Sequence, residues 1–103
     1  MKLVTIGITA ASLLFGAQAM ADQALATKQG CMACHQIDKK VVGPAFKDVA
    51  AKYKGDKTAE AKLDKKVKEG GKGTWGEIPM PANGPRVSDA DIKTLVHWVL
   101  SLK

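Results

Sequence analysis

The sequence has little aromatic side-chain volume, only two cysteines and no segment with the pattern of a β-strand. Its 103 residues include two Phe, two Trp and one Tyr. Apart from the N-terminal stretch, no segment is apolar enough to cross a bilayer. A chain this short buries a modest fraction of its surface, and it often needs a stabilising group in addition to its own side chains. We therefore expect one small helical domain whose thin core is completed by another group.

The two cysteines lie in the motif Cys31-Met32-Ala33-Cys34-His35, which reads C-x-x-C-H. This pattern is the attachment signature of a c-type haem. Two thiols at this spacing can each form a thioether with one haem vinyl group, and the histidine that follows can bind the iron. The motif predicts one haem c, held covalently by Cys31 and Cys34, with His35 as an axial ligand.

Three other interpretations of the cysteine pair are weaker. A thioredoxin-like redox pair needs a βαβ context, which the sequence does not offer. A tetrahedral zinc site needs four ligands, and the second histidine, His97, lies far along the chain. A disulfide between Cys31 and Cys34 would close too short a loop to stabilise the domain much.

Residues 1–21 have the features of a secretory signal peptide. Lys2 gives a positive start, residues 3–17 are mostly apolar and uncharged, and residues 19–21 read Ala-Met-Ala, a small-x-small cleavage site. The alternative is an uncleaved membrane anchor, for which the apolar run is short and wrongly flanked. We expect cleavage to leave one domain, residues 22–103, in the periplasm and without a membrane span.

The chain is basic, with a formal net charge of +6 that falls by one when Lys2 leaves with the leader. Nucleic-acid binding is disfavoured, because the lysines alternate with acidic residues along helical faces and the protein is expected to be exported. Two interpretations remain open. The lysines belong to solvated helix faces, or they form a basic ring around a haem edge that steers an acidic redox partner.

Four segments of the expected mature domain have helical patterns: residues 22–30, 44–53, 56–69 and 88–103. The first leads directly into the cysteine motif. Pro44 can open the second, because the first turn of a helix needs no N–H there. Thr58 and Ser88 are candidate N-caps of the third and fourth.

Apolar residues mark the face that each helix should bury. In the second helix, Phe46, Val49, Ala50 and Tyr53 recur at helical spacing. Phe46 and Tyr53 could contact the haem or pack as ordinary core residues, and the pattern does not decide between these roles.

The last helix has the best-defined apolar face, formed by Ile92, Leu95, Val96, Val99 and Leu100. On a helical wheel His97 lies on the opposite face, which predicts an exposed histidine and not a rival iron ligand. Trp98 lies off the apolar face and is expected at its edge.

Residues 70–86 form a long segment rich in Gly and Pro, without a helical pattern, and such loops usually have a function. Pro79 and Pro81 hold Met80 in an extended backbone between them. A thioether commonly partners histidine in haem electron carriers. Met32 lies between the cysteines and the other two methionines leave with the leader, so Met80 is the candidate second axial ligand. The alternative is that Met80 is an apolar filler.

The chain resembles small bacterial class I cytochromes c of the c-551/c-552 (cytochrome c8) type. The matching segments are the C-x-x-C-H motif at 31–35, VVGPAFKDVAAKY at 41–53, GGKGTWGEIPMPAN at 70–83 and HWVLSLK at 97–103. The resemblance implies an all-α class I cytochrome c fold, in which four to five helices surround one covalently attached haem and the N- and C-terminal helices cross. Residue 82, an alanine, and residues 84–86 depart from the usual family pattern.

The resemblance also implies roles for individual residues. His35 and Met80 would be the axial pair, and the carbonyl of Pro44 would accept a hydrogen bond from His35. Trp75 would hydrogen-bond a haem propionate. Asn83 would lie near the methionine sulfur and help to set its geometry.

The function that follows is one-electron transfer in a respiratory chain and not catalysis, because His/Met ligation fills both axial positions. The expected partners are a cytochrome bc1-type donor and a nitrite reductase, oxidase or peroxidase acceptor. The protein itself is expected to be a monomer. Two alternatives are a five-coordinate haem enzyme or sensor and an electron-entry subunit of a larger oxidoreductase.

Overall fold

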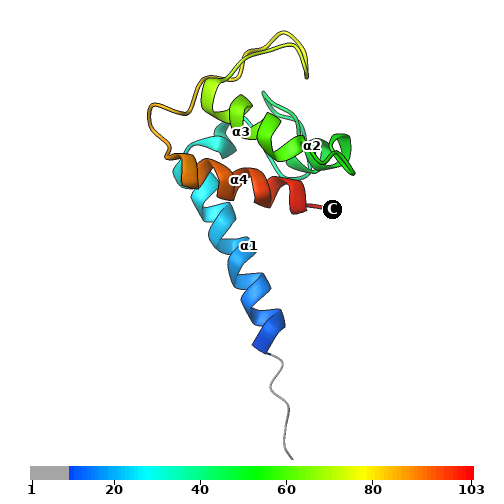
Figure 1. Ribbon diagram of the computed structural model, residues 1–103, viewed down its shortest axis with the longest axis vertical. Helices are drawn as coiled ribbons and strands as arrows, with labels where there is room; N and C mark the ends of the chain where they lie inside the picture. Colours follow the sequence, from blue (N-terminus) through cyan, green and yellow to red (C-terminus); the bar gives the residue numbers. More distant parts are fainter. Residues whose placement is uncertain (1–9) are drawn as a thin grey trace, which may run out of the picture.

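A computed structural model describes residues 10–103, with side chains described from residue 17 onward. Its elements in chain order are α1 (Ala10–Lys28), the short 3-10 helix η1 (Cys31–Ala33), α2 (Phe46–Lys52), α3 (Ala59–Glu69) and α4 (Asp89–Ser101) (Figure 1). Within the described part of the chain the only β-pairing is two isolated bridges. The all-α architecture predicted from the sequence is therefore confirmed.

Helix α4 is the element against which the others pack. It contacts α1, α2 and α3, and Figure 1 shows it crossing the upper part of α1. Its apolar face supplies the buried residues Ile92, Leu95 and Val96. Leu95 joins a core cluster with α1 and α2, whereas Ile92 and Val96 join a second cluster that Leu63 and Val67 of α3 cover. The crossing of the N- and C-terminal helices thus forms one side of the core.

Trp98 is more deeply buried than the sequence predicted. We expected it at the edge of the apolar face, but it is only 4% exposed and packs in the cluster with Ala26, Phe46 and Leu95. Its ring meets that of Phe46 edge-on, with centroids 5.6 Å apart and an interplanar angle of 74°. The expectation is wrong because α4 packs against three other helices, which buries a wider face than one apolar stripe.

The two predicted N-caps, Ser88 and Thr58, differ in whether the side chain makes a capping hydrogen bond. The Ser88 hydroxyl accepts a hydrogen bond from the backbone N–H of Asp91 at 3.2 Å, as predicted for an N-cap. Thr58 occupies the N-cap position of α3, but its own side chain makes no capping bond. Instead, Asp56 Oδ1 accepts from the Thr58 hydroxyl at 2.6 Å and from the Thr58 N–H at 2.8 Å, and Lys62 Nζ lies 3.1 Å from Asp56 Oδ2.

These bonds make the stability of the N-terminal end of α3 depend on pH. The hydrogen bond from the Thr58 hydroxyl, and then the other two, lower the pKa of Asp56 from 3.8 to about 2. Because the folded-state pKa lies below the unfolded one, the stabilisation is present above pH 3.8 and is lost as the pH falls through about 2. We expect Asp56→Ala to lower the midpoint of urea unfolding at neutral pH. The difference in midpoint between the variant and the wild type should become smaller as the pH falls from 3.8 to about 2.

Thr58→Val is the matched control for this prediction. It removes the hydroxyl donor but keeps the backbone N–H, so its midpoint should lie between those of the wild type and Asp56→Ala. A gap between wild type and Asp56→Ala that stays constant from pH 7 down to the acid limb would contradict the assignment.

Helix α1 begins earlier than the sequence predicted. The helix expected from Asp22 starts at Ala10 and continues through residues 19–21, where the leader is expected to be cleaved. The Ala, Leu and Gln residues of that stretch are good helix formers, so the helix extends upstream when the leader is present. Residues 1–9 of the expected leader lie outside the described part of the chain. Among the described helices, none is long and apolar enough to cross a membrane.

Candidate functional site

A cavity of about 380 Å³ brings the cysteine motif and the 70–86 loop together. Cys31, Cys34, His35 and Met80 all line it. The other walls are largely apolar and come from α2, α3 and α4; they include Phe46, Val49, Leu63, Val67, Leu95, Val96 and Trp98. The structure thus places the four residues predicted to hold a haem around one apolar space.

The 3-10 helix η1 turns the cysteine motif toward this cavity. The N–H groups of Cys34 and His35 both donate to the Cys31 carbonyl, at 3.2 and 3.0 Å. Both cysteines are free thiols. Burial raises the pKa of the Cys31 thiol, and the positive charge of Arg86 partly opposes this shift. Because neither cysteine is in a disulfide and both line the cavity, both can be joined covalently to a ligand there.

His35 is held in one orientation. Its Nδ1 lies 2.8 Å from the Pro44 carbonyl oxygen, to which the neutral ring donates a hydrogen bond. Nε2 then carries the free lone pair, which is the arrangement of a metal-binding histidine. Phe46 stacks on the imidazole, with ring centroids 4.9 Å apart and an interplanar angle of 21°.

A glycine allows this close approach. Gly43 donates its N–H to the Cys34 carbonyl at 2.7 Å, which closes the loop after the motif. A Cβ atom at Gly43 would lie 2.5 Å from Cε1 and 2.8 Å from Nδ1 of His35. The position therefore has no room for a side chain while His35 keeps its orientation.

We expect Gly43→Ala to displace the His35 ring and to destabilise the holoprotein by about 2 kcal/mol, as overpacking typically does. The absorption spectrum of the haem should change with it. Gly55→Ala is the control, because Gly55 has φ +80° but no atom within 4 Å of its would-be Cβ. That variant should show only the backbone cost of about 1 kcal/mol and an unchanged haem spectrum. Equal effects in the two variants would count against a special role of Gly43.

Met80 is fixed by a short antiparallel bridge. Its N–H and carbonyl pair with the carbonyl and N–H of Gly71, at 2.8 and 3.0 Å, so residues 71–80 form the hairpin at the top of Figure 1. Gly70 has φ +73°, and a Cβ there would meet the Met80 carbonyl oxygen at 2.5 Å. Met32, the other methionine of the expected mature domain, packs against the core cluster of α1, α2 and α4 and does not line the cavity.

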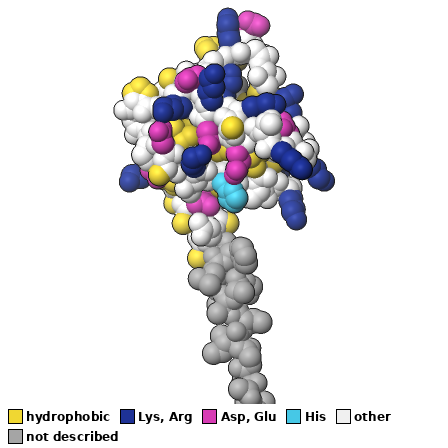
Figure 2. Space-filling view, viewed as in Figure 1, with side chains coloured by type: hydrophobic (Ala, Val, Ile, Leu, Met, Phe, Trp, Pro, Cys, Tyr) yellow, Lys and Arg dark blue, Asp and Glu magenta, His cyan; other side chains and the backbone are white. Residues whose placement is uncertain are grey.

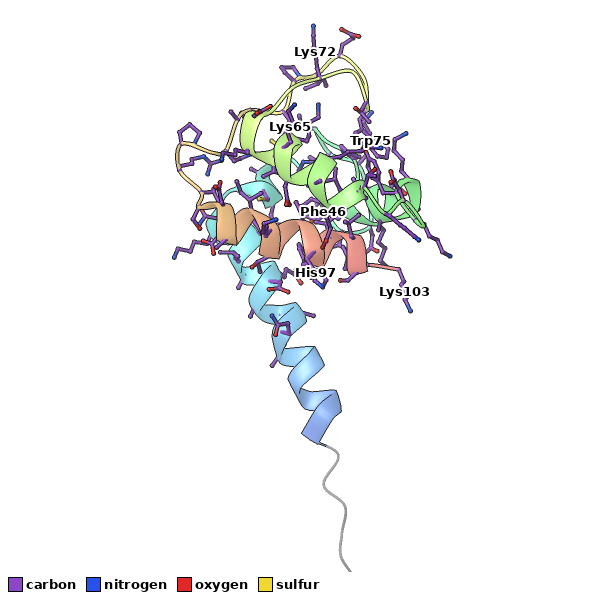
Figure 3. The ribbon with its side chains drawn as sticks, in the orientation of Figure 1. Phe46, Lys65, Lys72, Trp75, His97 and Lys103 are labelled. Carbon is purple, nitrogen blue, oxygen red and sulfur yellow. The ribbon has the colours of Figure 1, made fainter. Side chains whose placement is uncertain are left out.

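The remaining predicted residues fall into two groups. Pro44, Phe46 and Trp75 line the cavity; Trp75 is 42% exposed, and Lys52 Nζ lies 5.4 Å from its ring centroid (Figure 3). Asn83 does not line the cavity. Although it is only 6% exposed, its amide faces the backbone and another side chain, as described below.

His97 lies on the far side of α4 from the hairpin, as Figure 3 shows. It is exposed, as predicted, and its Nδ1 lies 2.9 Å from Glu60 Oε1.

The cavity fits a haem c. It offers two free thiols, an imidazole whose Nε2 is available and a thioether, inside walls that are mostly apolar. These are the donor types that thioether attachment and His/Met ligation need. Sequence reasoning did not identify Gly43, which the His35 ring approaches closely, or Arg86, whose charge acts on Cys31.

Comparison with known proteins agrees with this fit. The chain is 53% identical to cytochrome c-552 of Nitrosomonas europaea over 100% of both chains. It is 50% identical to cytochrome c-551 of Pseudomonas aeruginosa, over 98% of this chain and 95% of that one. The crystal structure of wild-type Nitrosomonas europaea cytochrome c552 superposes with a TM-score of 0.75 at 54% identity, covering 79% of this chain and 99% of the other.

A sequence profile of the family described as Cytochrome c matches residues 19–103, which include all the cavity residues named above. Members of this family bind one covalently attached haem c and act as electron carriers and not as enzymes. The arrangement of helices around one apolar cavity agrees with this similarity. The chain therefore belongs to the cytochrome c family.

Proposed function

We propose that the protein is a diffusible one-electron carrier of the periplasm, in which His35 and Met80 are the two axial ligands of the haem iron. Haem c, when bound, supplies a one-electron redox couple. The observation that carries the proposal is that His35, with Nε2 free, and the tethered Met80 line the same cavity as both thiols.

The protein would tune this site in three ways. The Pro44 carbonyl orients His35 and raises its basicity as a ligand. The apolar walls exclude water and lower the local dielectric constant, which favours the less charged ferrous state. The Met80 thioether favours the same state, so both effects raise the reduction potential.

Export is the second part of the proposal. The features of residues 1–21 support a cleaved leader and a mature domain of residues 22–103.

Redox partners would meet the protein at the mouth of the cavity. Val42, Trp75 and Ile78 line the cavity and are 44%, 42% and 65% exposed, so they form an apolar rim. In Figure 2 the lysines are spread over the visible face among acidic residues and do not gather in one patch. We propose transient contacts at this rim with a bc1-type donor and a nitrite reductase, oxidase or peroxidase acceptor.

Carbon monoxide binding tests the proposal against the five-coordinate enzyme or sensor. If Met80 fills the sixth position, the reduced holoprotein should bind carbon monoxide slowly or not at all at neutral pH. Rapid binding by the wild-type protein would overturn the proposed ligation and favour the alternative.

A further inference from the structure

Arg86 links the segment before the cysteine motif to the segment after Met80, two segments that lie far apart in the sequence. Its Nη1 donates to the Gln29 carbonyl at 2.6 Å, across 57 residues. Its Nη2 donates to Asn83 Oδ1, also at 2.6 Å. Gln29 lies two residues before Cys31, and Asn83 lies three residues after Met80. One guanidinium therefore joins the cysteine segment to the methionine segment.

The Gln29 end of this link is a helix terminus. Helix α1 ends at Lys28, and the carbonyl groups of its last turn carry the negative end of the helix dipole. A cation that donates to such a carbonyl caps the helix. Arg86 thus holds the chain where α1 passes into the cysteine motif.

The Asn83 end is bonded to the residue that follows Met80. The Asn83 side-chain amide donates to the carbonyls of Pro81 at 3.1 Å and Val67 at 3.2 Å, and its backbone N–H donates to Val67 at 3.0 Å. Asn83 is 6% exposed, so its Oδ1 depends on Arg86 for a strong partner. The chain of bonds Gln29–Arg86–Asn83–Pro81 therefore ends next to the ligand candidate.

We propose that Arg86 is a positioning residue that keeps Met80 seated at the sixth position of the iron. The proposal rests on the proposed function, because it takes Met80 as a ligand. The guanidinium holds its N–H donors in a rigid planar fork, and its Nη1 and Nη2 reach two acceptors at once. A lysine has a single nitrogen on a flexible stem and cannot reproduce this geometry. Without the fork, the segment after Met80 loses its link to the end of α1, and Met80 leaves the iron more readily.

The test is competition for the sixth position in the ferric holoprotein. Imidazole is titrated into wild type, Arg86→Lys, Arg86→Gln and Lys28→Gln, and its apparent dissociation constant is read from the haem absorption spectrum. Lys28 is exposed and lies one residue before Gln29, so its variant removes a positive charge at the same helix end. Both Arg86 variants should bind imidazole about tenfold more tightly than wild type, as expected for one lost charge-assisted hydrogen bond, whereas Lys28→Gln should not.

Two results would overturn the proposal while leaving the His35/Met80 assignment in place. The first is wild-type imidazole affinity in both Arg86 variants. The second is wild-type affinity in Arg86→Lys together with tighter binding in Arg86→Gln and Lys28→Gln, which would make charge the cause and not the fork. Failure of the ligand assignment itself gives a different result: the wild-type protein would lack the absorption band of methionine–iron ligation. If Arg86→Gln does not fold, Arg86→Lys, which keeps the charge, decides the test.

Discussion

Replacing Met80 with alanine should lower the reduction potential of the holoprotein by an amount on the order of 0.2 V, within the roughly 0.8 V that axial ligands span in haem proteins. The thioether stabilises the ferrous state, and a water or an empty position does not. The variant should also bind carbon monoxide rapidly when reduced. Potentiometric titration and rapid mixing with carbon monoxide measure the two effects.

Met32→Ala is the matched control, because it removes the other thioether of the expected mature domain. Met32 packs against the core cluster of α1, α2 and α4 and not against the cavity. Its loss should lower the thermal midpoint but leave the potential and carbon monoxide binding close to wild type. A Met80→Ala protein with an unchanged potential would show that Met80 is only an apolar filler.

Loss of the haem should leave the chain largely unfolded. Without the haem, the apolar walls of the cavity of about 380 Å³ lose their packing partner, and lost packing of core side chains costs several kcal/mol. Small domains are stable by about 5–15 kcal/mol in total. We expect Cys31→Ala/Cys34→Ala, which cannot form either thioether, to lose most of the helical circular dichroism of the holoprotein when purified without haem.

The single variant Cys31→Ala provides the comparison. It retains one thiol and should keep the haem and the helical signal, with a lower thermal midpoint. A native-like helical spectrum and a cooperative thermal transition in the haem-free double variant would show that the helices form a stable core without the cofactor.

The helices of the expected mature domain could be predicted because their signals are local. Ser88 caps α4 as its sequence position predicts, and the apolar face predicted for this helix supplies the buried residues Ile92, Leu95 and Val96. The burial of Trp98 could not be read from one helix, because it depends on how α1 and α2 approach α4. Thr58 is the N-cap residue of α3 as predicted, but its hydroxyl donates to Asp56 and makes no capping bond, which its position in the sequence does not indicate.

The candidate site was predictable to a similar degree. A five-residue motif and a Pro-flanked methionine identify Cys31, Cys34, His35 and Met80, and the structure places all four around one cavity. The Arg86 link was not predictable, because it joins residues that are 57 positions apart and depends on the path of the loop.

The absorption spectrum of the ferric wild-type holoprotein at neutral pH tests the central claim most directly. Methionine–iron ligation gives ferric cytochromes a weak band at the red end of the visible range. We expect this band in the wild type and its disappearance in Met80→Ala. A folded wild-type protein without the band would contradict ligation by Met80, and with it the assignment of the protein as a carrier with both axial positions filled.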